Sequence, residues 1–241
     1  MSITYTLIQA RNDGDVAKPE EHAAFAERLG VPVEQIKPLD IFADDMSLET
    51  LQGSDAVLVG GSGEYSVLDD HPKIIDFIDF LGLITTTDIP MFASCFGFQA
   101  LVLALGGQII KAPERAEVGT FVLRPTKACA GDAIFSTLPD PFNAQLGHQD
   151  QASILPEVVE NLASSELTEF QALKVTGKNV YATQFHPELT SEENRKRFRR
   201  YMHIYGALFG EVKAQEILDS HQPSPEANNL LGLFHSRIVT A

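Results

Sequence analysis

The sequence has few cysteines, few basic residues and no long hydrophobic run, and each shortage excludes a class of protein. Its 241 residues include two cysteines, Cys95 and Cys129, too few for a disulfide framework or a paired-cysteine metal site. Lysine and arginine number 18 against 33 acidic residues, and the formal net charge of −15 disfavours binding to nucleic acid or anionic membranes. No apolar run approaches the roughly 18 residues of a membrane span, and the N-terminus lacks a basic segment followed by an apolar one. We therefore expect a cytoplasmic protein that uses no metal and contacts neither nucleic acid nor membrane.

Apolar runs alternate with helical patterns in the first half of the chain. Residues 3–8 are predicted to form a strand and 19–29 a helix, and the apolar run 56–59 ends in a glycine-rich loop. Asp70 is expected to cap a helix over 72–81. This order predicts an α/β fold with a doubly wound, mostly parallel sheet and helices on both faces.

The second half has a different pattern. Short β-type segments between residues 118 and 184 predict a few added antiparallel strands. Thr190 and Glu193 have the spacing of a capping box and open a helix expected to reach Tyr205. Its five basic residues favour a solvated face over a docking site for an acidic partner. We expect a domain over residues 1–209 and a helical extension over 210–241, whose amphipathic stretch 229–238 suggests docking or a homodimer.

Cys95 stands where an apolar run ends in small residues and a helical pattern begins, so a strand delivers this thiol to a helix N-terminus. Backbone N–H groups at a helix N-terminus carry partial positive charge, which favours the reactive thiolate. His186 follows another predicted strand, and Glu188 stands two residues further on. A thiol, an imidazole and a carboxylate supply the three roles of a nucleophilic triad. The alternatives are a buried core thiol and a histidine paired to a backbone carbonyl.

The motifs Cys95-Phe96-Gly97-Phe98-Gln99 and Phe185-His186-Pro187-Glu188 resemble those of the class I, triad-type glutamine amidotransferases. The closest resemblance is to free-standing members related to the amidotransferase half of GMP synthase. The order and spacing of four motifs agree over roughly residues 3 to 205. The resemblance implies the flavodoxin-like fold of this family and cleavage of glutamine to glutamate and ammonia through a cysteine thioester, without a cofactor.

Site residues follow from the resemblance position by position. Cys95 would be the nucleophile, His186 the general base and acid, and Glu188 the orienting carboxylate. Backbone N–H groups of Gly61 and Phe96 would form the oxyanion hole. The resemblance also implies residues that hold the substrate or line its pocket, namely Gln99, Gly60, Gly147, His148 and Gln149.

Three departures from the family motifs concern the surroundings of the nucleophile. Ala93 replaces the first glycine of the elbow and is still small enough for a tight turn. Phe98 replaces a histidine, which removes a polar group near the pocket or a partner interface. Ser62 replaces a proline of the glycine loop. Glu64, Tyr65 and Arg115 are candidates for substrate specificity, and Cys129 is expected to be an ordinary thiol.

Three functions remain open at this point. The first is a glutamine amidotransferase subunit or glutaminase; because the chain lacks a nucleotide-binding phosphate loop, an ammonia acceptor would need a synthase or other amidating partner. The second is a hydrolase of γ-glutamyl peptides or other γ-glutamyl conjugates. The third is a non-catalytic relative that binds a metabolite or regulates a partner.

Overall fold

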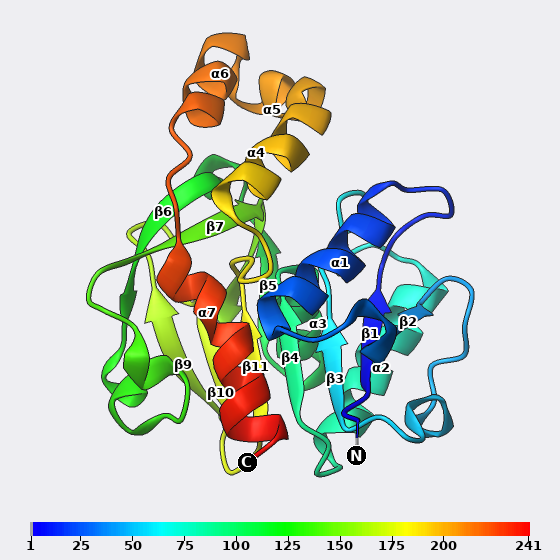
Figure 1. Ribbon diagram of the computed structural model, residues 1–241. Helices are drawn as coiled ribbons and strands as arrows, with labels where there is room; N and C mark the ends of the chain where they lie inside the picture. The colour runs from blue at the N-terminus through cyan, green and yellow to red at the C-terminus, as the bar shows by residue number, and fades with distance from the viewer. Residues whose placement is uncertain (1) are drawn as a thin grey trace.

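Five parallel strands form the centre of the fold, which the computed structural model describes for residues 2–241 (Figure 1). Every residue of the four strands nearest the middle is buried. Complete burial is typical of parallel strands that helices cover on both faces, so the predicted parallel core is confirmed. The strands lie in the order β2 (Ile36–Asp40), β1 (Tyr5–Gln9), β3 (Ala56–Val59), β4 (Met91–Ser94) and β11 (Val180–Thr183).

Antiparallel strands extend the sheet beyond β11, and this part is larger than the few added strands that the sequence predicts. In spatial order they are β10 (Ala172–Val175), β9 (Val159–Ser164), β6 (Glu117–Pro125) and β7 (Phe142–His148). A separate two-stranded sheet pairs β5 (Gln108–Lys111) with β8 (Asp150–Ile154). The predicted α/β class, with a mostly parallel sheet between two helical layers, is confirmed.

Helices cover both faces of the sheet (Figure 1). On one face α1 (Ala17–Leu29) and α7 (Pro225–Phe234) place Phe25 and Leu230 against the strands. On the other, α2 (Pro72–Thr85) and α3 (Phe96–Ala104) contribute Phe77 and Leu101 to a second core. Burying large apolar side chains on both faces supplies the main stabilising free energy of such a fold.

The start of α2 differs from the prediction. His71, not Asp70, caps this helix, because the His71 Nδ1 accepts a hydrogen bond from the Lys73 N–H at 3.2 Å. Pro72 occupies the first helical position, where a missing N–H costs nothing.

The capping box that opens α4 (Ser191–Arg200) is confirmed, since Thr190 and Glu193 exchange side-chain and backbone hydrogen bonds. The helix expected to reach residue 205 is interrupted at Tyr201, where α5 (Met202–Phe209) begins. Together with α6 (Glu211–Asp219), these helices stand above the carboxyl ends of the parallel strands (Figure 1).

After α6 the chain returns to the core. Leu230, Leu231 and Phe234 of α7 are buried among residues of the sheet, and the Tyr5 hydroxyl lies 2.6 Å from the Nδ1 of His235. The amphipathic stretch predicted to dock or to dimerise therefore covers the core of its own chain. None of the helices within residues 2–241 is long and apolar enough to cross a membrane.

Candidate active site

Cys95 occupies a sharp turn between β4 and α3. Its backbone has φ 51° and ψ −101°, and within residues 2–241 it is the one residue other than glycine with a positive φ. Such a conformation costs on the order of 1–3 kcal/mol and persists only where the surroundings enforce it. The Cys95 N–H donates to the Thr183 carbonyl at 2.7 Å, which ties the turn to β11. The thiol is consequently held at the carboxyl end of two buried strands.

His186 and Glu188 follow β11 and meet beside Cys95. The His186 Nδ1–H donates to Glu188 Oε1 at 2.7 Å, and both side chains are buried. Burial lowers the pKa of His186, but the negative charges of Glu188 and Cys95 outweigh it and raise that pKa to about 9. Near neutral pH the imidazole therefore carries a proton, and its charge stabilises a neighbouring thiolate.

The glycine loop after β3 rests on a buried ion pair. Arg11 donates to Glu21 Oε1 at 2.8 Å and to Oε2 at 3.1 Å, and the Gly61 N–H donates to Glu21 Oε1 at 3.1 Å. Burial raises the pKa of Glu21, but the charge and hydrogen bonds of Arg11 outweigh it and lower that pKa. A Cβ on Gly60 would lie 2.5 Å from the same carboxylate, so only glycine fits there. Glu21 thus engages the amide of Gly61 that the sequence assigns to the oxyanion hole.

The amide of Phe96 has a different environment. Phe96 is the first residue of α3, so its N–H has no acceptor inside the helix. Its ring stacks on Phe77 with centroids 5.8 Å apart, which fixes the start of the helix beside the nucleophile. This amide is available to an oxygen bound at Cys95.

Two glutamines support the floor of the site. Gln99 Nε2 donates to the Asp150 carbonyl at 2.8 Å and to Gln184 Oε1 at 3.2 Å. Gln184 Nε2 in turn lies 3.8 Å from the Cys95 sulfur. The predicted Gln99 therefore reaches the nucleophile through Gln184, a neighbour that sequence reasoning did not assign although it stands two residues before His186.

His148 belongs to a second buried network. Its Nε2 donates to Glu117 Oε2 at 3.1 Å and its Nδ1 to the Asp150 carbonyl at 3.0 Å. Both ring nitrogens of His148 therefore lie within hydrogen-bonding distance of an oxygen. Burial raises the pKa of Glu117, but the hydrogen bond and charge of His148 outweigh it and lower that pKa. His148 is thereby fixed in place and shapes the loop that carries Gly147.

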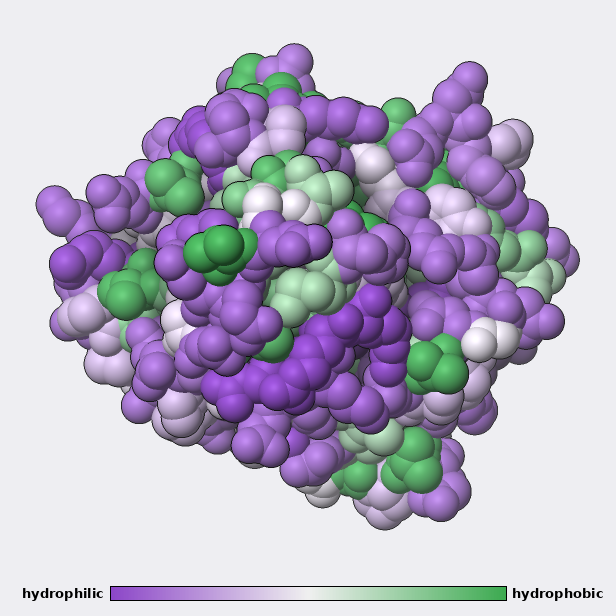
Figure 2. Space-filling view, turned by 90° about the horizontal axis from the view of Figure 1, so that it is seen from above, coloured by the Kyte–Doolittle hydropathy of each residue, from purple (hydrophilic) through white to green (hydrophobic). Residues whose placement is uncertain are grey.

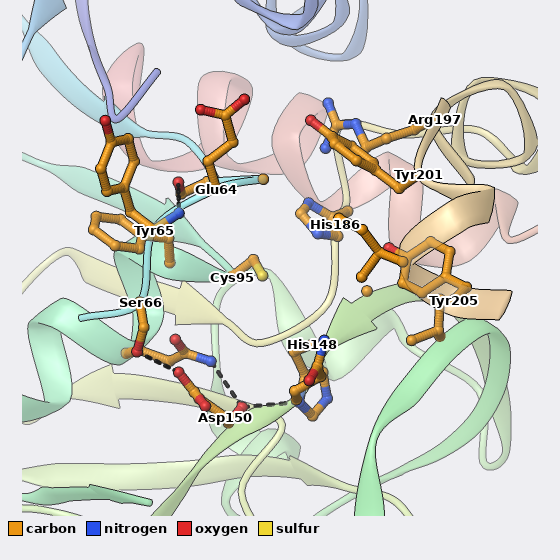
Figure 3. Close-up of a pocket in the computed structure, with 18 of the residues that line it drawn as sticks. Glu64, Tyr65, Ser66, Cys95, His148, Asp150, His186, Arg197, Tyr201 and Tyr205 are labelled. Carbon is orange, nitrogen blue, oxygen red and sulfur yellow. Dashed lines mark hydrogen bonds between the residues drawn. The ribbon is translucent and has the colours of Figure 1, made fainter. Parts of the chain in front are cut away.

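These elements enclose a pocket of about 340 Å³ over Cys95 (Figure 3). Its volume is at the lower end of the range of about 300–1,000 Å³ for small-molecule sites, which suits a small substrate. No group of three or more metal-ligating side chains exists among residues 2–241. The predicted residues that line the pocket are Glu64, Tyr65, Cys95, Phe96, Gln99, Gly147, His148, Gln149 and His186.

Known proteins resemble this chain in sequence and in fold. A family model described as glutamine amidotransferase class-I matches residues 23–203, which is most of the chain. The chain belongs to the class I glutamine amidotransferase family. The matched segment contains the glycine loop, Cys95 and the buried, hydrogen-bonded pair His186 and Glu188.

Curated relatives of this amidotransferase include GMP synthases. One subunit of the glutamine-hydrolysing GMP synthase from Sulfolobus acidocaldarius is 30% identical over 161 residues, which are 66% of this chain and 81% of that protein. The glutamine-hydrolysing GMP synthase of Thermosipho africanus is 33% identical over 148 residues. That match covers 61% of this chain but only 27% of the length of the Thermosipho protein.

A solved structure agrees in fold. The crystal structure of a glutamine amidotransferase from Thermotoga maritima superimposes with a TM-score of 0.71 at 20% identity, covering all of both chains. Its low identity supports the fold of this amidotransferase and not its substrate.

Two residues that the sequence suggests near the pocket do not line it. Phe98 is completely buried in the core that α2 and α3 share with the sheet, and it does not line the pocket. Its difference from the family motif therefore concerns packing. Arg115 also lies outside the pocket lining, where its guanidinium donates to the Leu167 carbonyl. The prediction for Cys129 as an ordinary thiol agrees with the structure, since it is buried and its sulfur donates to the Leu162 carbonyl.

Sequence reasoning missed the roof of the pocket. The side chains that form it come from α4, α5 and the turn between them, and we call this set the helical roof: Arg197, Tyr201, Ile204 and Tyr205. Gly63 leaves room for it, because a Cβ there would overlap the Tyr201 hydroxyl oxygen. Burial, with smaller contributions from the charges of Cys95 and Tyr201, raises the pKa of Tyr205 to about 12, so its hydroxyl stays protonated.

Proposed function

We propose that this chain hydrolyses a γ-glutamyl amide, in the simplest case glutamine to glutamate and ammonia, through a thioester on Cys95. The observation that carries the proposal is the position of the Cys95 thiol, on a strained turn beside a His186 that Glu188 orients. A nucleophile, a proton carrier and an orienting acid in contact are what acyl transfer requires.

The first half of the proposed reaction forms the thioester. The Cys95 thiolate attacks the γ-carbonyl carbon, and the electron pair of the carbonyl moves to its oxygen. As the tetrahedral intermediate collapses, the C–N bond breaks, and His186 delivers its proton to the departing nitrogen. Phe96 N–H supports the oxyanion. Gly61 N–H would contribute after turning away from Glu21, and one such donor is worth about 10²–10³ in rate.

The second half releases glutamate. Neutral His186 takes a proton from water, whose oxygen attacks the thioester carbonyl carbon. Collapse of this intermediate breaks the C–S bond and restores the thiolate beside the imidazolium. Glu188 keeps the imidazole oriented in both halves and stabilises its cation.

The two enzymatic alternatives differ in the leaving group. For glutamine, ammonia would pass to an amidating partner, as the subunit name of the Sulfolobus acidocaldarius relative suggests for that protein. A γ-glutamyl conjugate hydrolase needs no partner. One observation favours this second candidate: the pocket is covered by side chains of the chain's own helical roof, which would lie against an amine larger than ammonia.

Glutamate release tests the proposal. Purified wild-type chain and Cys95→Ala are incubated with glutamine and with γ-glutamylglycine, and glutamate is measured over time. We expect release by the wild type and a loss of at least about 10⁴-fold in Cys95→Ala, in line with removal of other triad nucleophiles. Mass spectrometry of acid-quenched wild type should show a glutamyl adduct on Cys95. Equal release by both proteins, or none by either, would refute the proposed chemistry.

A further inference from the structure

The basic residues of α4 separate into distinct roles in the folded chain. Lys196 Nζ lies 2.7 Å from Glu20 Oε1, and Arg200 NH2 lies 3.0 Å from Glu20 Oε2, which links α4 to α1. Arg195 donates to the His221 carbonyl at 3.4 Å, and Arg199 is exposed. Arg197 is the member of this cluster that lines the pocket, where it is half-buried (Figure 3).

Arg197 has no partner for its charge in the part of the chain that the structure describes, residues 2–241, where no hydrogen bond or ion pair involves its guanidinium. The charge of Arg197 helps to lower the pKa of Glu21. That carboxylate, however, already accepts hydrogen bonds from Arg11, Gln9 and the Gly61 N–H. A guanidinium withdrawn from part of its water and left without an anion favours a negatively charged ligand.

The other charged groups of the pocket do not offer an equivalent site. Arg11 is paired with Glu21 and Asp15, and Lys111 is exposed. Among the acids, Glu64 accepts from Asn12 and Asp150 accepts from Ser66. Arg197 is thus the half-buried cation of the pocket that a substrate can neutralise.

The position of Arg197 relative to the triad indicates which part of a substrate it would meet. Figure 3 shows Arg197, Tyr201 and Tyr205 on the His186 side of Cys95, with Tyr65, Ser66 and Asp150 on the other. His186 must face the departing nitrogen in order to protonate it. The groups beyond His186 therefore surround the leaving amine, and the opposite side holds the glutamyl part.

We infer that Arg197 binds a carboxylate carried by the leaving amine, so that the preferred substrates are γ-glutamyl amino acids. This inference rests on the proposed hydrolysis and names its substrate class. Tyr201 and Tyr205 complete the subsite with rings and hydroxyls that accommodate a small organic amine. In a chain with a net charge of −15, an anionic leaving group needs such a local cation.

The decisive comparison uses γ-glutamylglycine and γ-glutamylglycinamide, two substrates that differ only in the carboxylate charge of the leaving amine. We expect kcat/KM to be about 10- to 100-fold higher for γ-glutamylglycine, the usual worth of a charged hydrogen bond. Arg197→Gln should abolish this preference and leave kcat/KM for γ-glutamylglycinamide within about twofold of wild type. Arg197→Lys, which keeps the charge without the planar fork, should retain part of the preference.

Arg199→Gln is the matched control, since it removes the same side chain from the exposed face of the same helix. It should leave both substrates unchanged. Equal losses on both substrates in Arg197→Gln would show a merely structural role, and a wild type that does not prefer the carboxylate would also overturn the inference.

Binding to the inactive Cys95→Ala chain separates this inference from the proposed chemistry. Calorimetry should give a lower Kd for γ-glutamylglycine than for γ-glutamylglycinamide, and adding Arg197→Gln should remove the difference. A binding preference that depends on Arg197, together with no turnover by the wild type, would support the subsite and refute the hydrolysis. Turnover by the wild type with no preference for γ-glutamylglycine, in binding or in rate, would support the hydrolysis and refute the subsite.

Discussion

The pocket is built from two regions that are held in place differently. Cys95, His186 and Glu188 follow β4 and β11, whose residues are all buried and hydrogen-bonded to their neighbours. The helical roof belongs to α4 and α5; Ile204 is 39% exposed, and α5 buries none of its residues. The difference teaches that the groups proposed to break the amide bond are held rigidly by the sheet, whereas the groups that would contact the leaving amine lie on a thinly packed layer.

The surface agrees with this division. Viewed from above, over the roof, the molecule is mainly hydrophilic with scattered hydrophobic residues (Figure 2). Val212 of α6 is 78% exposed. The roof is held by a small apolar cluster that includes Phe198 and Tyr205, and by polar contacts such as those of Glu20. Exposed ion pairs of the Glu20 kind contribute at most about 1 kcal/mol each.

The largest predicted effect concerns the residues that follow β4 and β11. Glu188→Gln should lower kcat/KM by about 10²–10⁴ for every γ-glutamyl substrate, because the imidazole loses its orienting charge. The rate of Cys95 alkylation at neutral pH should also fall, since the charge of Glu188 is the main cause that raises the pKa of the neighbouring His186. If Glu188→Gln lowered kcat/KM for one substrate only, Glu188 would act in substrate specificity. The two regions would then not differ in function.

The second prediction compares two phenylalanines. Phe98→Ala should lower the free energy of unfolding by about 3–5 kcal/mol, because it empties a completely buried position. Phe209→Ala, in the half-buried end of α5, should cost about 1 kcal/mol. Urea unfolding of both variants measures the two changes. Similar losses would show that the roof is packed as firmly as the core.

The third prediction uses histidines whose pKa values shift in opposite directions. His186 has a raised pKa of about 9, so its contribution to stability is complete below about pH 6.5 and is lost as the pH rises through about 9, at most about 3 kcal/mol. Burial lowers the pKa of His221, which packs against Phe198 beneath the roof. Its neutral form is stabilised, so this contribution is present above the unfolded pKa and is lost as the pH falls.

Hydrogen exchange at mildly acidic and mildly alkaline pH measures this contrast. Protection factors should fall first around β11 in alkali and first in α4 and α6 in acid. His221→Asn should remove the acid effect and leave the alkaline one, whereas a uniform response across the chain would contradict the assignment.

The sequence predicted the triad because its members stand at the ends of apolar runs, and buried parallel strands bring such ends to one edge of a sheet. The helical roof could not be predicted in this way. Helical spacing places Arg197 on a face of α4, but which face meets the pocket depends on the break at Tyr201 and on the contacts of Glu20. Glu21 fits an ordinary acidic helix start, and only the fold brings it beneath Gly61. Phe98 was misjudged because burial behind the elbow cannot be read from a motif.

The return of α7 to the core has a practical consequence. Because Tyr5 at the start of β1 touches His235 just after α7, the first strand and the last helix come together near the amino ends of the parallel strands, on the side opposite the pocket (Figure 1). A dye, an affinity handle or a solid support attached at either end would leave the mouth of the pocket facing outward. Joining these ends through a short linker and opening the chain in a surface loop should yield a circular permutant with the same active site.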